Sequence, residues 1–188
     1  ILKFITPMKN HLLIASFFIC FNLTGQTNTP SPTIFEKHHE VKLGVIKLLS
    51  GPIFDGTYEY VKDRNMGYGA MLLVNFNKRY DIYPIDYAFT PFFRMYFDQN
   101  EDYGAKGFFV ETFLSFYGGK DDKESLVNPF DKNNDPYFDT ALGFSLGQKW
   151  INSGGFVLEG KLGVGRNLLG NAPFEAIVKG DVFIGYRF

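Results

Sequence analysis

The fold is decided by the final stretch of the chain, A-I-V-K-G-D-V-F-I-G-Y-R-F, residues 176–188. Side chains alternate between the two faces of a β-strand. In a strand, one face of this stretch would carry Ala176, Val178, Val182, Ile184, Tyr186 and Phe188. The other face would carry Ile177, Lys179, Asp181, Phe183, Gly185 and Arg187. One side is large and apolar while the other mixes charged and small residues, which predicts a strand between two different environments.

Seven earlier segments repeat this alternation, and clusters of Gly, Asn, Asp and Pro separate them. We predict strands at about 40–50, 55–62, 66–76, 86–98, 106–117, 137–149, 155–165 and 176–188. The composition agrees, because 22 Phe, 11 Tyr and 20 Gly are typical of an all-β chain with many turns. A length of 188 residues fits one folded domain. The first strand is the weakest, because Lys47 falls on its apolar face, so we expect a bulge or an early end there.

The solvent around the apolar face separates two interpretations. A soluble antiparallel sheet can hide such a face in its core. Here, however, the polar faces are rich in Gly, Ala and Ser, which suit a narrow lumen, and the segments have the 9–11 residues that a tilted membrane strand needs. We therefore predict an all-β fold, an eight-stranded antiparallel up-and-down transmembrane β-barrel. The alternative is a soluble periplasmic calycin-like carrier that binds an apolar ligand inside.

The N-terminal part has the order of a secretory leader. Residues 1–7 precede Met8, and Lys9 comes before an apolar run over 12–23 that ends near Gly25. A run of about 12 residues is short for a spanning helix and is typical of a signal peptide. We therefore assign 1–25 to upstream residues and signal peptide, 26–39 to a flexible periplasmic lead-in and 40–188 to the barrel. The expected location is the bacterial outer membrane, with the periplasm as the alternative.

Alternation also predicts which charged residues face the lumen. The basic ones are Lys42, Arg94, Lys149, Lys161, Lys179 and Arg187. The acidic ones are Glu59, Asp98, Glu111, Asp139, Glu159 and Asp181. Because an unpaired charge in a narrow interior is costly, six of each sign predicts a network of ion pairs. We interpret it as a structural interior, with a gated ion path or a small polar-ligand site as the alternative.

Several activities are disfavoured by what the sequence lacks. The three histidines, His11, His38 and His39, all precede the strands or stand at their start, whereas barrel-embedded hydrolases use a histidine base near the outer rim. No Gly-x-Ser-x-Gly elbow, phosphate loop or His/Cys metal cluster is present. A net charge of −1 gives no basic field for nucleic acid. We expect no enzyme activity, no catalytic or metal residues, no cofactor and no nucleic-acid partner.

The last strand carries a family resemblance. Its end, V-F-I-G-Y-R-F (182–188), resembles that of small bacterial outer-membrane β-barrels, and G-T-Y-E-Y (56–60) is similar to uncharacterised families of this kind. The resemblance implies that Ile184, Tyr186 and Phe188 form a signal read by the barrel assembly machinery, and that outer-membrane lipid surrounds the protein. It supplies no shared catalytic residues. With both termini periplasmic, the longest predicted loop, 118–136, faces outward and is a candidate site for an extracellular partner.

Overall fold

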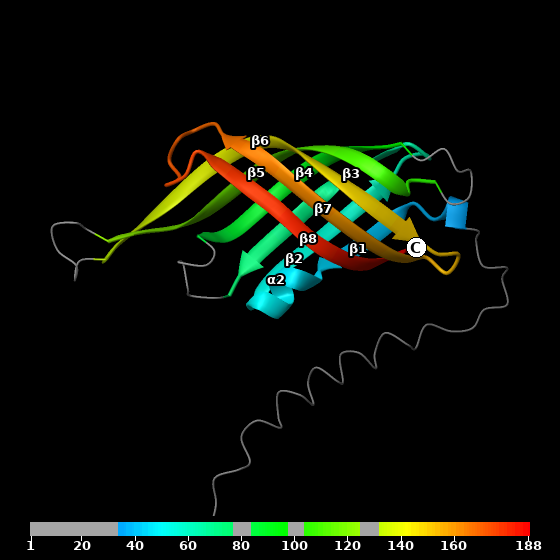
Figure 1. Cartoon of the computed structure of the whole chain (residues 1–188), viewed down its shortest axis with the longest axis horizontal. Coiled ribbons are helices and arrows are strands. Elements are labelled where there is room, and N and C mark those ends of the chain that lie inside the picture. Colours follow the sequence, from blue (N-terminus) through cyan, green and yellow to red (C-terminus); the bar gives the residue numbers. More distant parts are fainter. Residues whose placement is uncertain (1–33, 77–83, 98–103, 125–131) are drawn as a thin grey trace, which may run out of the picture. The chain divides into compact units, whose positions relative to one another are not determined.

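The computed structural model describes residues 34–76, 84–97, 104–124 and 132–188. In this part of the chain, eight antiparallel strands follow one another around a closed up-and-down barrel, and β1 closes against β8 (Figure 1). The elements are a 3-10 turn at Ile34–Glu36, β1 (His39–Gly44), α2 (Val45–Ser50), β2 (Ile53–Val61), β3 (Met66–Asn75), β4 (Ile85–Tyr96), β5 (Gly107–Glu124), β6 (Lys132–Ile151), β7 (Phe156–Asn167) and β8 (Ala176–Arg187). The all-β class, the strand number and the topology predicted from the sequence are confirmed.

The register around the barrel sets the tilt of its strands. A row of paired residues starts at Glu40 on β1, crosses every ladder and reaches Ile177 on β8. Glu40 itself pairs with Arg187, so the row returns ten residues away from its start. A stagger of ten over eight strands corresponds to a tilt of about 40° from the barrel axis. A barrel of this size has an interior that side chains fill.

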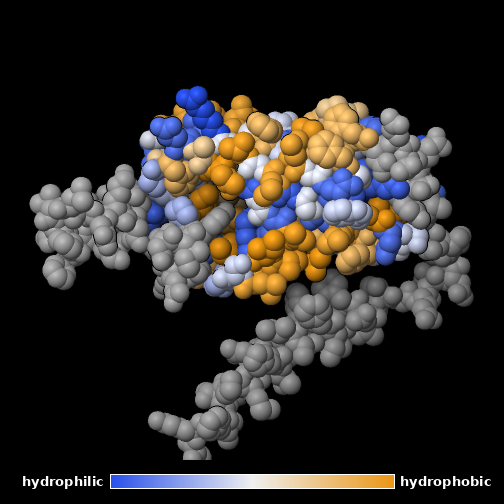
Figure 2. Space-filling view, viewed as in Figure 1, coloured by the Kyte–Doolittle hydropathy of each residue, from blue (hydrophilic) through white to orange (hydrophobic). Residues whose placement is uncertain are grey.

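The two faces of the wall differ in chemistry in the way that the alternation predicts. Large apolar side chains point outward, and Phe144, Leu162 and Val178 are 55%, 71% and 76% exposed. Apolar surface accordingly covers much of the wall in Figure 2. Charged side chains point inward, and Glu59, Arg94 and Glu159 are fully buried. The apolar face of the sheet is thus on the outside of the barrel.

The first predicted strand, 40–50, is wrong in its second half. β1 ends at Gly44, and the next six residues form α2. The carboxylate of Asp181 accepts hydrogen bonds from the backbone N–H groups of Ile46 and Lys47, 2.8 and 3.3 Å away. The ammonium of Lys47 pairs with Asp55 instead of entering the apolar outer face. This ion pair explains physically why the strand stops early.

The predicted long loop 118–136 is largely a β-ribbon. β5 and β6 stay paired from Gly107↔Lys149 to Glu124↔Lys132, so only 125–131 connects them, and those residues lie outside the described part. β4 stays paired with β5 only as far as Gly119, and β7 pairs with β6 only from Ala141 onward. The ribbon therefore runs past the neighbouring strands (Figure 1).

The lead-in predicted over 26–39 is partly ordered, whereas 26–33 and the leader 1–25 lie outside the described residues. Ile34 begins the 3-10 turn and is only 6% exposed. His38 uses Nδ1 to bond the carbonyl oxygen of Val61 at 2.7 Å, and His39 already belongs to β1. Contacts with the end of β2 thus hold this segment against the barrel.

Candidate functional site

A buried ion network fills the half of the lumen near the chain's C-terminus. Arg94 lies at its centre, with guanidinium nitrogens 2.9 Å from Glu59, 2.5 Å from Glu111 and 2.7 Å from Glu159. Lys42 bridges Glu59 and Glu159 at 2.5 and 2.6 Å. Neighbouring strands with inward charged positions bring these groups together, although Lys42 and Glu159 are 117 residues apart.

A second arm of the network extends toward the chain ends. Lys149 contacts Glu40 at 2.8 Å and Glu59 at 3.0 Å, and Arg187 contacts Glu40 at 2.6 Å. The hydroxyl of Tyr96 donates to Glu59 as well. The Arg94 guanidinium also lies over the ring of Phe109, 4.0 Å from its centroid, a favourable cation–π geometry.

Equal numbers of opposite charges meet in this part of the lumen. The four cations are Lys42, Arg94, Lys149 and Arg187. The four carboxylates are Glu40, Glu59, Glu111 and Glu159. Every carboxylate of this set already accepts from cations, so none is held ready to take a proton from a substrate. Buried charges cost several kcal/mol each unless they are paired, and this set is paired throughout. The arrangement therefore favours a rigid filling of the barrel.

The other half of the lumen begins with a polar belt, which we define as Asp55, Thr57, Thr90, Ser115, Lys161, Lys179 and Asp181. Lys179 donates to Thr90 at 2.7 Å, and Thr90 shares a hydrogen bond of 2.8 Å with Ser115. Lys161 contacts Glu111 at 3.4 Å, which joins the belt to the ion network. The hydroxyl of Thr57 is buried and has no hydrogen-bond partner.

Both ends of the barrel are closed within the described residues. At one end Ala105, with φ of 47°, is 1% exposed, and Arg187 donates to the carbonyl oxygens of Gly104 and Ala105 at 3.1 and 3.2 Å. At the other end the rings of Tyr117, Tyr137 and Phe174 pack against one another. An axial path through the lumen is therefore filled by side chains.

The eleven residues of the predicted lumen network separate into two groups. Eight of them meet in the salt bridges described above, namely Lys42, Glu59, Arg94, Glu111, Lys149, Glu159, Lys161 and Arg187. Asp181 caps α2, and Lys179 bonds a hydroxyl. Asp139 lies at the rim next to the 168–172 segment. The inward assignment of Asp98 falls outside the described residues.

Asp139 ties the rim together. Its carboxylate accepts from the backbone N–H groups of Leu169, Asn171 and Ala172 at 3.1, 2.8 and 2.9 Å, and from that of Thr140 at 2.6 Å. Burial acts to raise the pKa of this carboxyl, but the four N–H donors outweigh burial and hold the pKa below its usual range. The ionised carboxylate thus fixes the connection between β7 and β8.

Sequence reasoning missed four members of the lumen, Glu40, Lys47, Asp55 and Tyr96. Glu40 stands two residues before Lys42, so the alternation along β1 could have identified it as inward. Tyr96 follows the same rule two residues after Arg94. Lys47 and Asp55 were hidden by the unexpected helix. The partner of each charge depends on the stagger between strands, which the sequence does not state.

The three residues of the predicted assembly signal, Ile184, Tyr186 and Phe188, all point outward and are 42%, 48% and 54% exposed. Phe188 exchanges backbone hydrogen bonds with His39, at 2.8 and 3.2 Å. The rings of Phe188 and His39 also stack, with centroids 5.9 Å apart. The last residue therefore contributes to closing β8 against β1.

Metal-binding and helical membrane features are absent from the described residues. No three His, Cys, Asp or Glu side chains of the described ranges gather into a metal-type cluster. No helix in that part of the chain has the length and apolar character to cross a membrane. No protein-family model matches the chain, and comparisons with curated proteins and with solved structures also return no match.

Proposed function

We propose that this chain is a bacterial outer-membrane β-barrel with a non-enzymatic role, either structural or as an interaction module that acts through its outer loops. One observation carries the proposal. The barrel wall is apolar on its outside while its interior is ionised and paired. In water this arrangement would expose the most apolar side chains of the protein, whereas in a bilayer it buries them in hydrocarbon.

The dimensions of the apolar wall support this environment. On β8 the outward residues from Val178 to Phe188 are exposed and apolar, apart from Gly180. Ten residues of a strand tilted by about 40° span about 25 Å along the barrel axis, which is the height of an outer-membrane barrel's apolar band. Outward aromatics, among them Trp150 and Phe156, lie at one border of this band. On β6 the band begins near Leu142, so Asp139 lies beyond it.

The paired β5–β6 ribbon supports the interaction role. It projects past Gly119 and Ala141, where no other described strand pairs with it. If the chain termini are periplasmic, the ribbon stands on the outer side and could present its 118–136 tip to an extracellular partner. The leader at 1–25 would direct export, and the barrel assembly machinery would read Ile184, Tyr186 and Phe188.

The carrier alternative fits the interior less well. A calycin-like carrier needs an apolar cavity within the barrel, but here Arg94 and three glutamates occupy the centre. The apolar inward residues near the rim, including Phe113 and Tyr117, are buried against one another. An enzymatic role finds no support either, because the buried carboxylates are committed to ion pairs.

Fractionation tests the proposal directly. The full-length protein should be recovered in the outer-membrane fraction, and after mild detergent extraction it should migrate faster on a gel unboiled than boiled, as a folded barrel does. Recovery in the soluble periplasmic extract would instead support the carrier. For the enzyme alternative, altered lipid A or phospholipid profiles in a deletion strain would contradict the non-enzymatic role.

A further inference from the structure

The barrel wall has a gap beside β1. On one side the pairing of β1 with β8 ends at Gly44↔Phe183, and on the other its pairing with β2 ends at Leu43↔Gly56. β8 nevertheless continues to Ala176 and β2 to Ile53. Residues 176–182 of β8 therefore have a strand partner on the β7 side alone among the described strands. α2 lies at this gap and contacts both β2 and β8.

The gap exposes backbone polar groups to the outside of the wall. Phe188 bonds toward β1, and in an antiparallel strand alternate residues bond toward the same neighbour. Val182, Gly180 and Val178 consequently direct their backbone groups into the gap. The N–H of Val182 donates to Oδ1 of Asp181 at 2.7 Å, but β1 offers no strand to Gly180 and Val178. Hydrocarbon cannot satisfy such groups, so in a bilayer the gap favours a polar occupant.

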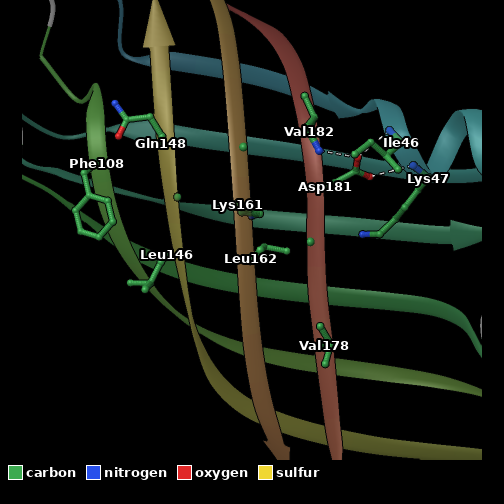
Figure 3. A pocket seen from close by; sticks show the side chains of 13 residues that line it. Ile46, Lys47, Phe108, Leu146, Gln148, Lys161, Leu162, Val178, Asp181 and Val182 are labelled. Atoms are coloured by element: carbon green, nitrogen blue, oxygen red, sulfur yellow. Dashed lines mark hydrogen bonds between the residues drawn. The ribbon is translucent and has the colours of Figure 1, made fainter.

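An apolar groove begins at the same place on the outer surface. Its volume is about 890 Å³, and its lining includes Ile46, Leu162, Val178, Gly180, Gly160 and Phe108. Figure 3 draws Leu162 and Val178 on β7 and β8, with Asp181 beside α2. From Val178 to Phe108 the register descends by about 20 Å along the barrel axis, close to the length of a long acyl chain. A ligand tail in this groove would run from the gap toward the opposite membrane face.

The polar belt lies behind the gap, on the inside of the same wall. Lys179 extends from the gap-lining strand β8 and is in no salt bridge among the residues that the structure describes; its ammonium meets the hydroxyl of Thr90 and, at 4.9 Å, the ring of Phe113. Thr57, from β2 across the gap, has its buried unpartnered hydroxyl here. One uncompensated cation and a free hydroxyl donor suit one acceptor group with a single negative charge.

We propose that this gap is a lateral binding site for a long-chain fatty acid. The acyl chain lies in the outer groove, and the carboxylate enters between β8 and α2 to meet the Lys179 ammonium and the Thr57 hydroxyl. The site rests on the proposed function, because it opens toward the membrane. A carboxylate is narrow and bears one charge, which matches the single cation, whereas a lysophospholipid head is wider.

Pairing with a second copy of the chain does not fit this gap. In a dimer whose axis stands along the membrane normal, the two β8 strands would tilt in opposite directions. With a tilt of about 40° they would cross at about 80°, so their edges could not form a ladder.

Binding of radiolabelled palmitate to the refolded full chain in phosphatidylcholine nanodiscs tests the site. Gly160→Leu places a side chain in the groove where an added Cβ meets no atom within 4 Å, so the variant is expected to fold. Its control is Ala70→Leu, which adds the same side chain to a distant part of the outer wall. Lys179→Met removes the cation, and its control is Lys62→Met at an exposed turn.

The wild-type chain should bind one palmitate, and Gly160→Leu and Lys179→Met should each weaken binding about 10-fold, the effect of one charge-assisted hydrogen bond or of a blocked groove. Both controls should bind as the wild type does, and hexadecanol should compete at least about 10-fold less well than palmitate. Equal binding by all variants, or no binding by a chain with heat-modifiable mobility, would overturn the site while leaving the barrel proposal intact. Stronger competition by lysophosphatidylglycerol than by palmitate would overturn the fatty acid as its ligand. A chain that fails to insert into bilayers would count against the proposed function instead.

Discussion

The backbone N–H of Ile46 donates a hydrogen bond to Asp181 across the seam of the barrel, over 2.8 Å and 135 residues of sequence. Gly44, the N-cap residue of α2, offers no side-chain cap, so the carboxylate from β8 takes that role. The same carboxylate accepts from Lys47 and from Val182. Asp181 thereby determines where β1 ends and where the wall gap begins.

Removal of this cap should loosen α2. We expect Asp181→Ala to lower the free energy of unfolding by about 1 kcal/mol, the usual cost of a lost N-cap. Asp181→Asn keeps an oxygen acceptor and should lose less. Equilibrium unfolding in urea, followed by gel mobility and circular dichroism, measures the difference. Equal stability of Asp181→Ala and the wild type would show that the cap does not hold the helix.

The central cation should matter far more than any exposed one. Arg94→Met leaves Glu59, Glu111 and Glu159 close together without their shared guanidinium, so we expect a loss of about 3–5 kcal/mol or a failure to fold. Arg166→Met, at an exposed position, is the matched control and should stay within about 0.5 kcal/mol of the wild type. Urea unfolding compares them; if Arg94→Met were as stable as the control, the network would not stabilise the interior.

The sequence predicts the strands well because the pattern that it carries is local. Alternation along 176–188 and along the other strands is a property of neighbouring residues, so it identifies Arg94, Glu111 and Glu159 as inward. The contacts between them depend on the ten-residue stagger, which is a property of the closed barrel. α2 was missed because its cap, Asp181, is remote in sequence. Lys47 alone signalled the end of β1, since it could not remain on an apolar face.

A charge placed on the outer wall tests the solvent there. Leu162 is 71% exposed near the middle of the apolar band. If that band is in hydrocarbon, Leu162→Arg should cost about 2–4 kcal/mol of folding free energy in vesicles. Leu168→Arg, at an exposed position after β7, should cost little. Folding yields in phosphatidylcholine vesicles compare the two variants; if Leu162→Arg were as well tolerated as Leu168→Arg, the wall would be facing water.

The terminal residue should affect assembly more than its exposed position suggests. Phe188 closes the last backbone pair with His39, so its deletion removes two hydrogen bonds and a stacked ring at the seam. We expect the truncated chain to reach the outer membrane in strongly reduced amounts. Phe156→Ser changes another outward aromatic, 50% exposed, and serves as the control. Normal membrane levels of the truncated chain would contradict the assembly-signal interpretation.

The carboxylate at the rim should make stability depend on pH in a predictable direction. The pKa of Asp139 is lower in the folded chain than the usual value of about 3.9, so its contribution is complete above that value and is lost as the pH falls through the folded pKa. Asp139→Asn should therefore be less stable than the wild type by about 1–2 kcal/mol near neutral pH, and the difference should shrink between about pH 4 and about pH 2. Urea unfolding of both proteins across this range measures it, with Glu175→Gln, an exposed carboxyl on the same rim segment, as the control. A difference that stayed constant with pH would mean that the charge of Asp139 does not hold the 168–172 segment.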